Sequence, residues 1–132
     1  MTKSTGKRVG IATPDAPGAI GPYSQAVRYG DALYCSGALP IDPGTGDLVQ
    51  DSLAAETRQC LENLEAVCQA AGTSLAQALR LTVYTTRLEG FAEINEAYAR
   101  AFDATPPARV TIGVAALPRD ARVEIDAIVA VG

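Results

Sequence analysis

Apolar and polar residues alternate along this chain with two different periods, and the changes of period mark the predicted elements. Alternation at every second residue predicts strands over residues 26–29, 32–39, 78–87, 109–115 and 122–131. Apolar residues spaced three and four apart predict helices over residues 53–71 and 91–102. A short apolar run at residues 9–11 favours an additional edge strand.

The long elements follow the order strand, strand, helix, strand, helix, strand, strand. Strands joined through a helix run parallel with right-handed crossovers, so both helices are expected on one face of a single mixed sheet. No remaining segment can cover the other face. We expect that face to carry mostly small, hydroxylated and aromatic side chains, namely Tyr34, Ser36, Ala38, Arg80, Thr82, Tyr84, Thr86, Arg109, Thr111, Glu124 and Asp126. Such a face fits contact with another copy of the chain, and we therefore predict a homo-oligomer.

The strand that begins at Arg109 follows two consecutive prolines, which end the preceding helix and keep the chain extended. Its alternation predicts that Arg109 and Thr111 point away from the core, opposite Val110 and Ile112. A guanidinium held on a stiff strand beside small residues is suited to bidentate capture of a carboxylate. The alternative interpretation is an arginine in a structural salt bridge.

Three further positions admit both a structural and a functional interpretation. Tyr23 follows a proline and is either a packing residue at the base of a loop or a placed hydroxyl. Gly37, inside a strand pattern, indicates that another group approaches the backbone closely. Asn95 interrupts the apolar stripe of the second helix, so its amide either caps a neighbouring loop or binds a ligand, since leaving it unpaired would cost about 1–3 kcal/mol.

Composition limits the classes of function. The 132 residues are enough for one domain with its own core, which we expect to span residues 1–132. Eleven basic and fifteen acidic residues give a net charge of −4, which argues against a nucleic-acid partner and favours a small substrate. Because the sequence contains no histidine, nucleophile relays that use histidine and histidine-bound metals are excluded.

The cysteines and the N-terminal segment indicate the compartment. Cys35, Cys60 and Cys68 fall inside apolar patterns and are expected to be buried free thiols in a reducing environment. Residues 1–8 are polar, and no apolar run approaches membrane length. We therefore expect a soluble, cytoplasmic protein without a membrane partner.

Four separated motifs, in this order, resemble the reactive intermediate deaminase (Rid) family, most closely its RidA enamine/imine deaminase subfamily. They are AIGPYSQ at residues 19–25, CSG at residues 35–37, FAEINEAY at residues 91–98, and PAR at residues 107–109 through VEI at residues 123–125. The resemblance implies a chorismate-mutase-like α+β fold, a homotrimer with active sites between its subunits, and no cofactor. It also implies that the last strand inserts antiparallel between two earlier parallel strands, whereas the spacing alone favours a hairpin between the last two strands.

The resemblance further implies roles for individual residues. Arg109 would hold the carboxylate of the substrate, and Glu124 together with the backbone carbonyl of Thr111 would place the attacking water. The other residues that would line the pocket are Tyr23, Ser36, Gly37 and Asn95. This chain departs from the usual family pattern in having Ala38 where glutamine is common and Thr111 where cysteine is frequent.

The chemistry implied is hydrolysis of a 2-imino acid, or of its 2-aminoacrylate-type enamine tautomer, to a 2-keto acid and ammonia. Water would add to the C=N carbon, a tetrahedral carbinolamine would form, and ammonia would leave. Two other functions stay open. One is a protein that binds keto acids without turnover, as a sensor or carrier. The other is a ribonuclease or translation inhibitor, against which the acidic charge and the absence of histidine count.

Overall fold

The computed structural model describes residues 6–103 and 105–132, so most of the polar N-terminal stretch, residues 1–5, lies outside the described residues. The strands are β1 (Val9–Ile11), β2 (Ala26–Tyr29), β3 (Ala32–Ala38), β4 (Ala78–Thr85), β5 (Ala108–Gly113) and β6 (Val123–Ala130). The helices are α1 (Leu53–Ala70) and α2 (Phe91–Ala99), with short 3₁₀ turns at Leu75–Gln77, Leu88–Gly90 and Pro118–Asp120. The predicted elements are therefore confirmed, with ends that differ by up to three residues.

The six strands form one mixed sheet in the order β1-β2-β3-β6-β4-β5. β6 lies antiparallel between β3 and β4, and β5 runs parallel to β4. This confirms the insertion of the last strand, and the hairpin that the spacing alone favours does not form. Within the described residues, β5 is the edge of the sheet and its outer side has no partner strand.

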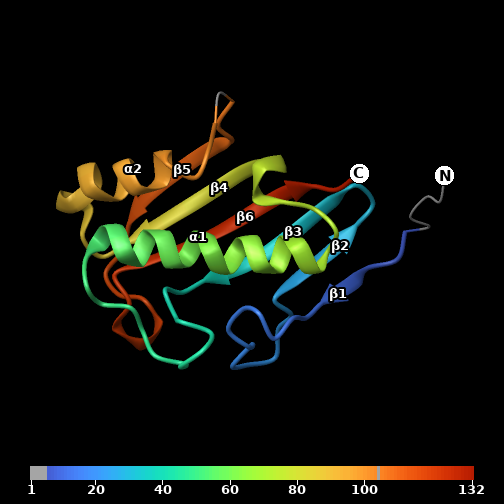
Figure 1. Ribbon diagram of the computed structural model, residues 1–132, viewed down its shortest axis with the longest axis horizontal. Coiled ribbons are helices and arrows are strands. Elements are labelled where there is room, and N and C mark those ends of the chain that lie inside the picture. The colour runs from blue at the N-terminus through green and yellow to red at the C-terminus, as the bar shows by residue number, and fades with distance from the viewer. Residues whose placement is uncertain (1–5, 104) are drawn as a thin grey trace.

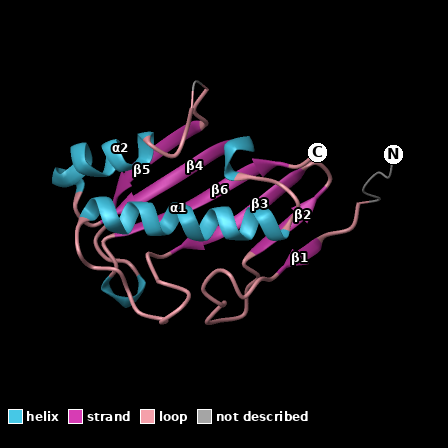
Figure 2. Cartoon of the chain, in the orientation of Figure 1, coloured by secondary structure: helices cyan, strands magenta, loops and turns pink. Residues whose placement is uncertain are grey.

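Both helices lie on one face of the sheet, as predicted (Figure 1, Figure 2). Between them and the sheet lies an aliphatic core that includes Leu33, Leu64, Leu81, Ile94 and Ile125. The three cysteines are buried and free, as expected. In the part of the chain that is described, neither helix has both the length and the apolar character needed to cross a membrane.

One prediction about the faces of the sheet is wrong. In the β4–β5 ladder Arg109 is paired with Leu81 and Thr111 with Val83, so Arg109 and Thr111 share the helix-covered face. Ile112, predicted to face the core, is instead 41% exposed on the uncovered face. Alternation separates two faces but does not say which one the helices cover. On this edge strand an apolar residue, Ile112, lies on the uncovered face, so apolar character alone does not identify the core side.

Three other residues also depart from simple alternation. A bulge between residues 35 and 38 of β3 places Ala38 opposite Ile125, on the helix-covered face. A second register shift, at the start of β4, leaves Leu79 52% exposed, although strict alternation with Leu81 would place it on the core face. Strict alternation with Glu124 would place Arg122 on the uncovered face, but its guanidinium forms an ion pair with Glu56 of α1.

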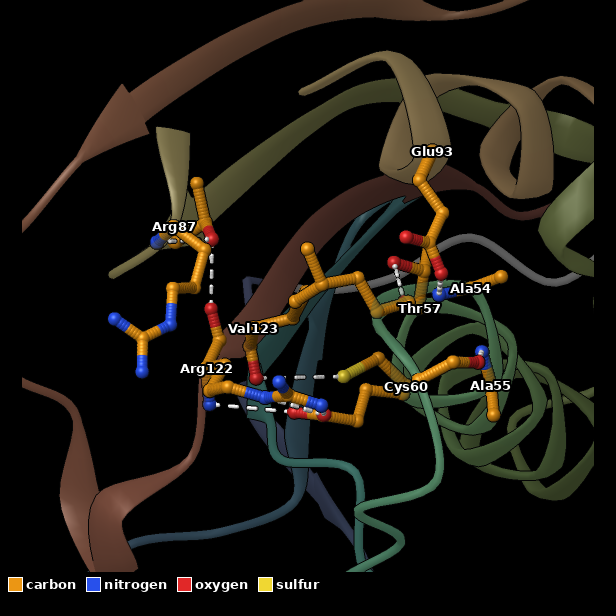
Figure 3. A network of polar contacts seen from close by, with 12 residues as sticks. Ala54, Ala55, Thr57, Cys60, Arg87, Glu93, Arg122 and Val123 are labelled. Carbon is orange, nitrogen blue, oxygen red and sulfur yellow. Dashed lines mark hydrogen bonds and ion pairs between the residues drawn. The ribbon is translucent and has the colours of Figure 1, made fainter. Parts of the chain in front are cut away.

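A polar network holds the start of β6 in place (Figure 3). Arg122 Nε donates to Glu56 Oε2 at 2.7 Å. The backbone oxygen of Arg122 accepts from Thr85 Oγ1 at 2.7 Å, and that of Val123 accepts from Cys60 Sγ at 3.7 Å. The first residues of β6 are therefore fixed from α1 on one side and from the end of β4 on the other.

Candidate active site

The candidate site residues form two separate clusters, and the first surrounds a cavity of about 420 Å³ at the end of β3. Four residues implied by the resemblance line it, namely Tyr23, Ser36, Gly37 and Glu124. The remaining wall is formed by Ala16, Pro17, Gly18, Ile20, Gln25, Ala38, Leu39, Ile41, Asn63, Leu64, Val67 and Pro118. We call this space the Glu124 cavity.

Glu124 lies directly over the backbone of Gly37. A Cβ atom at Gly37 would come within 2.9 Å of Glu124 Cδ and closer still to Oε2, so no other residue leaves room for the carboxylate in this position. The close approach predicted from Gly37 is therefore confirmed. Burial of Glu124, and to a smaller extent the neighbouring charge of Asp126, raise the pKa of its carboxyl group. A carboxyl group with a raised pKa is suited to exchanging protons near neutral pH.

The hydroxyl groups of this cluster are held differently. Ser36 Oγ donates to the backbone oxygen of Ser24 at 2.6 Å, which fixes its lone pairs relative to the cavity. Tyr23 is 49% exposed, and its hydroxyl oxygen accepts from the backbone N–H of Ile20 at 3.5 Å. Tyr23 is therefore a placed side chain at the mouth of the cavity rather than a core residue.

Gln25 has a structural role at the cavity that we did not predict. Its Nε2 donates to the backbone oxygens of Pro17 at 2.8 Å and Thr13 at 3.2 Å, and its Oε1 accepts from the Thr13 N–H at 2.7 Å. Gln25 thereby fixes the loop at residues 13–17 as one wall of the cavity. The available signal was an amide side chain immediately after a loop rich in proline and glycine.

The second cluster lies under α2. Arg109 Nη1 donates to Asn95 Oδ1 at 2.7 Å, and its guanidinium carbon lies 4.7 Å from the ring centre of Tyr98 and 5.5 Å from that of Phe91. Among the described residues, the Asn95 side chain makes its hydrogen bond to Arg109 and not to the backbone of a loop. It orients the arginine, a role that neither interpretation anticipated.

Arg109 has no carboxylate within ion-pairing distance among the described residues, whose ion pairs are Arg100–Glu96 and Arg122–Glu56. The salt-bridge interpretation of Arg109 is therefore wrong for a single chain. The hydroxyls of Tyr98 and Thr111, on the same side of the sheet, are buried without a hydrogen-bond partner in the described chain. Burial raises the pKa of Tyr98, while the charge of Arg109 acts in the opposite direction. The Tyr98 ring belongs to the core, as its place in the apolar stripe of α2 indicates, whereas helical spacing does not show that its hydroxyl lies beside Arg109.

One chain does not bring the two clusters together. Glu124 is paired with Tyr84 and Arg109 with Leu81, so the two residues are separated by three positions along β4 and lie two strands apart. These offsets correspond to about 10 Å along the strands and about 10 Å across them. The side chains also point to opposite faces of the sheet. The expectation that both residues lie on the uncovered face is therefore wrong for Arg109, and a single chain keeps the two side chains more than about 10 Å apart.

Comparison with known proteins identifies the family. A family model described as endoribonuclease L-PSP matches residues 13–131. RutC family protein y4sK of Sinorhizobium fredii is 49% identical, with 90% of this chain and 94% of that protein covered. The 2-iminobutanoate/2-iminopropanoate deaminase of Salmonella typhimurium is 44% identical, with 89% of this chain and 94% of that enzyme covered. The crystal structure of E. coli TdcF with bound serine has a TM-score of 0.90 and 42% identity, and the match covers 94% of this chain and 99% of that one. The chain therefore belongs to the endoribonuclease L-PSP family, which is the Rid family.

Proposed function

We propose that this protein is a RidA-type deaminase that hydrolyses 2-imino acids and 2-aminoacrylate-type enamines to 2-keto acids and ammonia. The observation that carries the proposal is the complementarity of the two clusters. Arg109 is a positioned cation without a carboxylate partner among the described residues of its own chain, and Glu124 is a carboxyl group with a raised pKa that lines a cavity. An imino acid needs both, since it combines a carboxylate with an electrophilic carbon. The relative named as a deaminase, at 44% identity, supports the same reaction.

The site would be completed by assembly. The uncovered face of the sheet exposes large apolar and aromatic side chains, with Tyr34 at 49% and Ile112 at 41% exposure, and exposed side chains of this kind are typical of a subunit interface. We propose a homotrimer in which β5 of one subunit lies against the Glu124 cavity of the next. Within the described part of the chain, β5 has no partner strand on its outer edge and Arg109 has no carboxylate partner, and both observations support this arrangement.

In the proposed mechanism, Arg109 of one subunit binds the substrate carboxylate in a bidentate manner and fixes the adjacent C=N carbon. Glu124 of the neighbouring subunit, with the Thr111 carbonyl, holds a water molecule and takes its proton as the oxygen attacks that carbon. That proton passes to the nitrogen and completes the carbinolamine. The hydroxyl proton of the carbinolamine then passes through Glu124 to the nitrogen as the C–N bond breaks, so ammonia leaves and the C=O bond of the 2-keto acid forms. Ser36 and Tyr23 supply hydroxyl groups around the same atoms. These steps use water and protein side chains.

The compartment is a separate point. The three free thiols fit a reducing compartment such as the cytoplasm.

The family description also raises ribonuclease activity as a candidate. The Glu124 cavity opposes it, because its ionisable lining residues are Glu124 and Tyr23, neither of which is a cation. An RNA backbone needs positive charge, and this chain carries −4 without a single histidine. Keto-acid binding without turnover uses the same cavity and is separated from catalysis by the assay below.

The direct test is to add the purified protein to a serine or threonine dehydratase reaction and follow the rate at which keto acid appears. We expect the lag caused by slow spontaneous hydrolysis to shorten. Arg109→Ala should lower the rate enhancement by at least roughly a hundredfold, and Arg109→Lys should restore only part of it, because lysine keeps the charge but not the planar fork. Arg100→Ala is the matched control, since Arg100 is exposed on α2. A folded Arg109→Ala protein with full activity would contradict the mechanism.

A further inference from the structure

The half-buried guanidinium of Arg109 is held by neutral groups. Its Nη1 donates to the amide oxygen of Asn95, and its carbon lies over the rings of Tyr98 and Phe91, at 4.7 and 5.5 Å from their centres. Among the described residues, no carboxylate lies within ion-pairing distance of it. Neutral partners hold a guanidinium without neutralising it, so its charge stays available to an incoming carboxylate.

The hydrogen bond to Asn95 does not fix the guanidinium by itself. It joins exposed groups, so water competes for both of them. A single bond from Nη1 also leaves the planar group free to turn about that contact. A ring beneath the guanidinium supplies the missing constraint, because it fixes the plane of the group and thereby the direction of its other N–H groups.

Of the two rings, that of Tyr98 is the closer and the better shielded from solvent. Tyr98 is 5% exposed, whereas Phe91 is 37% exposed. A contact between a cation and a ring is stronger where water is excluded from it. The Tyr98 ring in turn packs on Phe102, with ring centres 4.9 Å apart and planes tilted by 45°. Tyr98 is therefore a fixed surface against which the arginine rests.

The hydroxyl group of Tyr98 can be separated from its ring. That hydroxyl is buried without a hydrogen-bond partner in the described chain. A buried hydroxyl without a partner lowers stability, so its removal should not destabilise the fold. Phenylalanine at this position would keep the ring face and lose the hydroxyl alone. The two parts of the side chain therefore make different predictions.

We infer that Tyr98 is a positioning residue for carboxylate capture, and that it acts on Arg109 through the face of its ring. The inference rests on the proposed function, in which Arg109 binds the substrate carboxylate. The ring keeps the guanidinium in its binding orientation before the ligand arrives, so the arginine has less side-chain freedom to lose. Immobilising such a side chain on binding weakens affinity by about twofold to tenfold.

The test is an NMR titration of the assembled protein with pyruvate, which carries a carboxylate. Tyr98→Leu removes the ring face and should weaken pyruvate binding by about threefold to tenfold. Tyr98→Phe keeps the ring, so it should bind pyruvate as the parent does, with a melting temperature that does not fall. Ile94→Val is the control, because it removes a buried carbon from the same face of α2 and leaves the partners of Arg109 unchanged. It should bind pyruvate as the parent does.

A second comparison separates positioning from a general role in packing. Arg109→Lys keeps a cation but has no planar group for the ring to orient. In that background, Tyr98→Leu should change pyruvate affinity by less than about twofold, whereas a loss through general packing would be the same in both backgrounds. If Tyr98→Leu does not fold, Tyr98→Met replaces it, because methionine fills irregular space in a core without a ring face.

The outcomes separate this inference from the proposed function. Undiminished pyruvate binding in the folded leucine or methionine variant would overturn the inference, even if imines are hydrolysed. An equal loss in Tyr98→Phe would assign the effect to the hydroxyl and overturn it, as would a full loss in the Arg109→Lys background. A parent protein that does not bind pyruvate would overturn it as well. The expected pattern of binding, in a protein that never accelerates imine hydrolysis, would support the role of Tyr98 and contradict the deaminase proposal.

Discussion

Glu124 is held in an environment that disfavours its charge. Burial and the negative charge of Asp126, two residues further along β6, both raise its pKa from the reference value of 4.5. Asp126 itself accepts a hydrogen bond from the Tyr84 hydroxyl at 2.9 Å, and this contact raises the pKa of Tyr84 after the larger effect of burial. The uncovered face of the sheet thus carries two carboxylates, and the charge of Asp126 disfavours the ionised form of Glu124.

The pH dependence of imine hydrolysis should report this pKa. Glu124 takes a proton in its ionised form, so the rate should fall as the pH drops through its pKa, at a higher pH than for an ordinary glutamate. Asp126→Asn removes a like charge, which favours the ionised form, so the acid limb of the kcat/KM profile should move to lower pH. Part of the shift should remain, because burial is the larger cause. Asp47→Asn, in an exposed loop, is the control and should leave the pH profile unchanged. If the acid limb of the kcat/KM profile does not move in Asp126→Asn, that limb reports the pKa of a group other than Glu124.

Gly37 controls where that carboxylate lies. Gly37→Ala places a methyl group against the Glu124 carboxylate, which is the free end of a side chain and rotates away rather than unfolding the strand. We expect turnover to fall by at least about tenfold, because a displacement of about 1 Å at a reacting group is sufficient for such a loss. The melting temperature should change little. Gly10→Ala is the control, since the nearest atom to its new methyl group is Ser24 Oγ at 3.4 Å. Full activity in Gly37→Ala would show that the position of Glu124 is not critical.

At the scale of elements, the junction of α1 and β6 depends on one buried ion pair. The Glu56 side chain is 2% exposed and that of Arg122 is 32% exposed, and Glu56 also accepts from the Arg122 backbone N–H at 3.3 Å. Removing one partner of such a pair leaves the charge of the other partner uncompensated. The resulting loss of unfolding free energy depends on how deeply the remaining charge is buried.

This asymmetry gives a testable order of stabilities. Arg122→Ala leaves the buried Glu56 carboxylate unpaired and should lower the free energy of unfolding by about 3–5 kcal/mol. Glu56→Ala leaves an arginine that can reach solvent and should cost less. Urea unfolding measures both, with Arg100→Ala as a control, because the Arg100–Glu96 pair is exposed and should contribute little. The reverse order would mean that Arg122 mainly packs rather than compensates charge.

The elements themselves were predictable, whereas their faces were only partly so. The helix over residues 53–71 and the strand over residues 122–131 follow from periodicity, because each buries one clear apolar face. Alternation did not show which face of β5 meets the helices, since the uncovered face also carries apolar residues such as Ile112. The bulge that turns Ala38 toward α1 left no clear signal either. The contact between Arg109 and Asn95 required the packing of α2 on β5, which a one-dimensional pattern does not contain.

At the scale of the whole molecule, Arg109 and Glu124 should act across a subunit boundary. Mixing subunits tests this directly. Arg109→Ala and Glu124→Ala proteins, each inactive, would be refolded together in equal amounts. If every site in a cyclic assembly joins Arg109 of one subunit to Glu124 of the next, about a quarter of the sites regain both residues. The measurement is keto-acid formation by the mixed assembly relative to the parent.

The matching control is the same mixture prepared without refolding, in which subunits do not exchange. It should remain inactive. Well-folded mixed assemblies without activity would show that both residues act within one subunit, and would contradict the proposed arrangement.

The position of β6 also bears on how the protein is made. The strand at the centre of the sheet is synthesised after both of its neighbours, β3 and β4. While β6 is still inside the ribosome, the nascent chain exposes two unpaired strand edges and the apolar face beneath α1. The sheet is therefore expected to close only after synthesis has reached residue 130, so co-translational folding stops at partial structures whose open edges are the natural targets of chaperones.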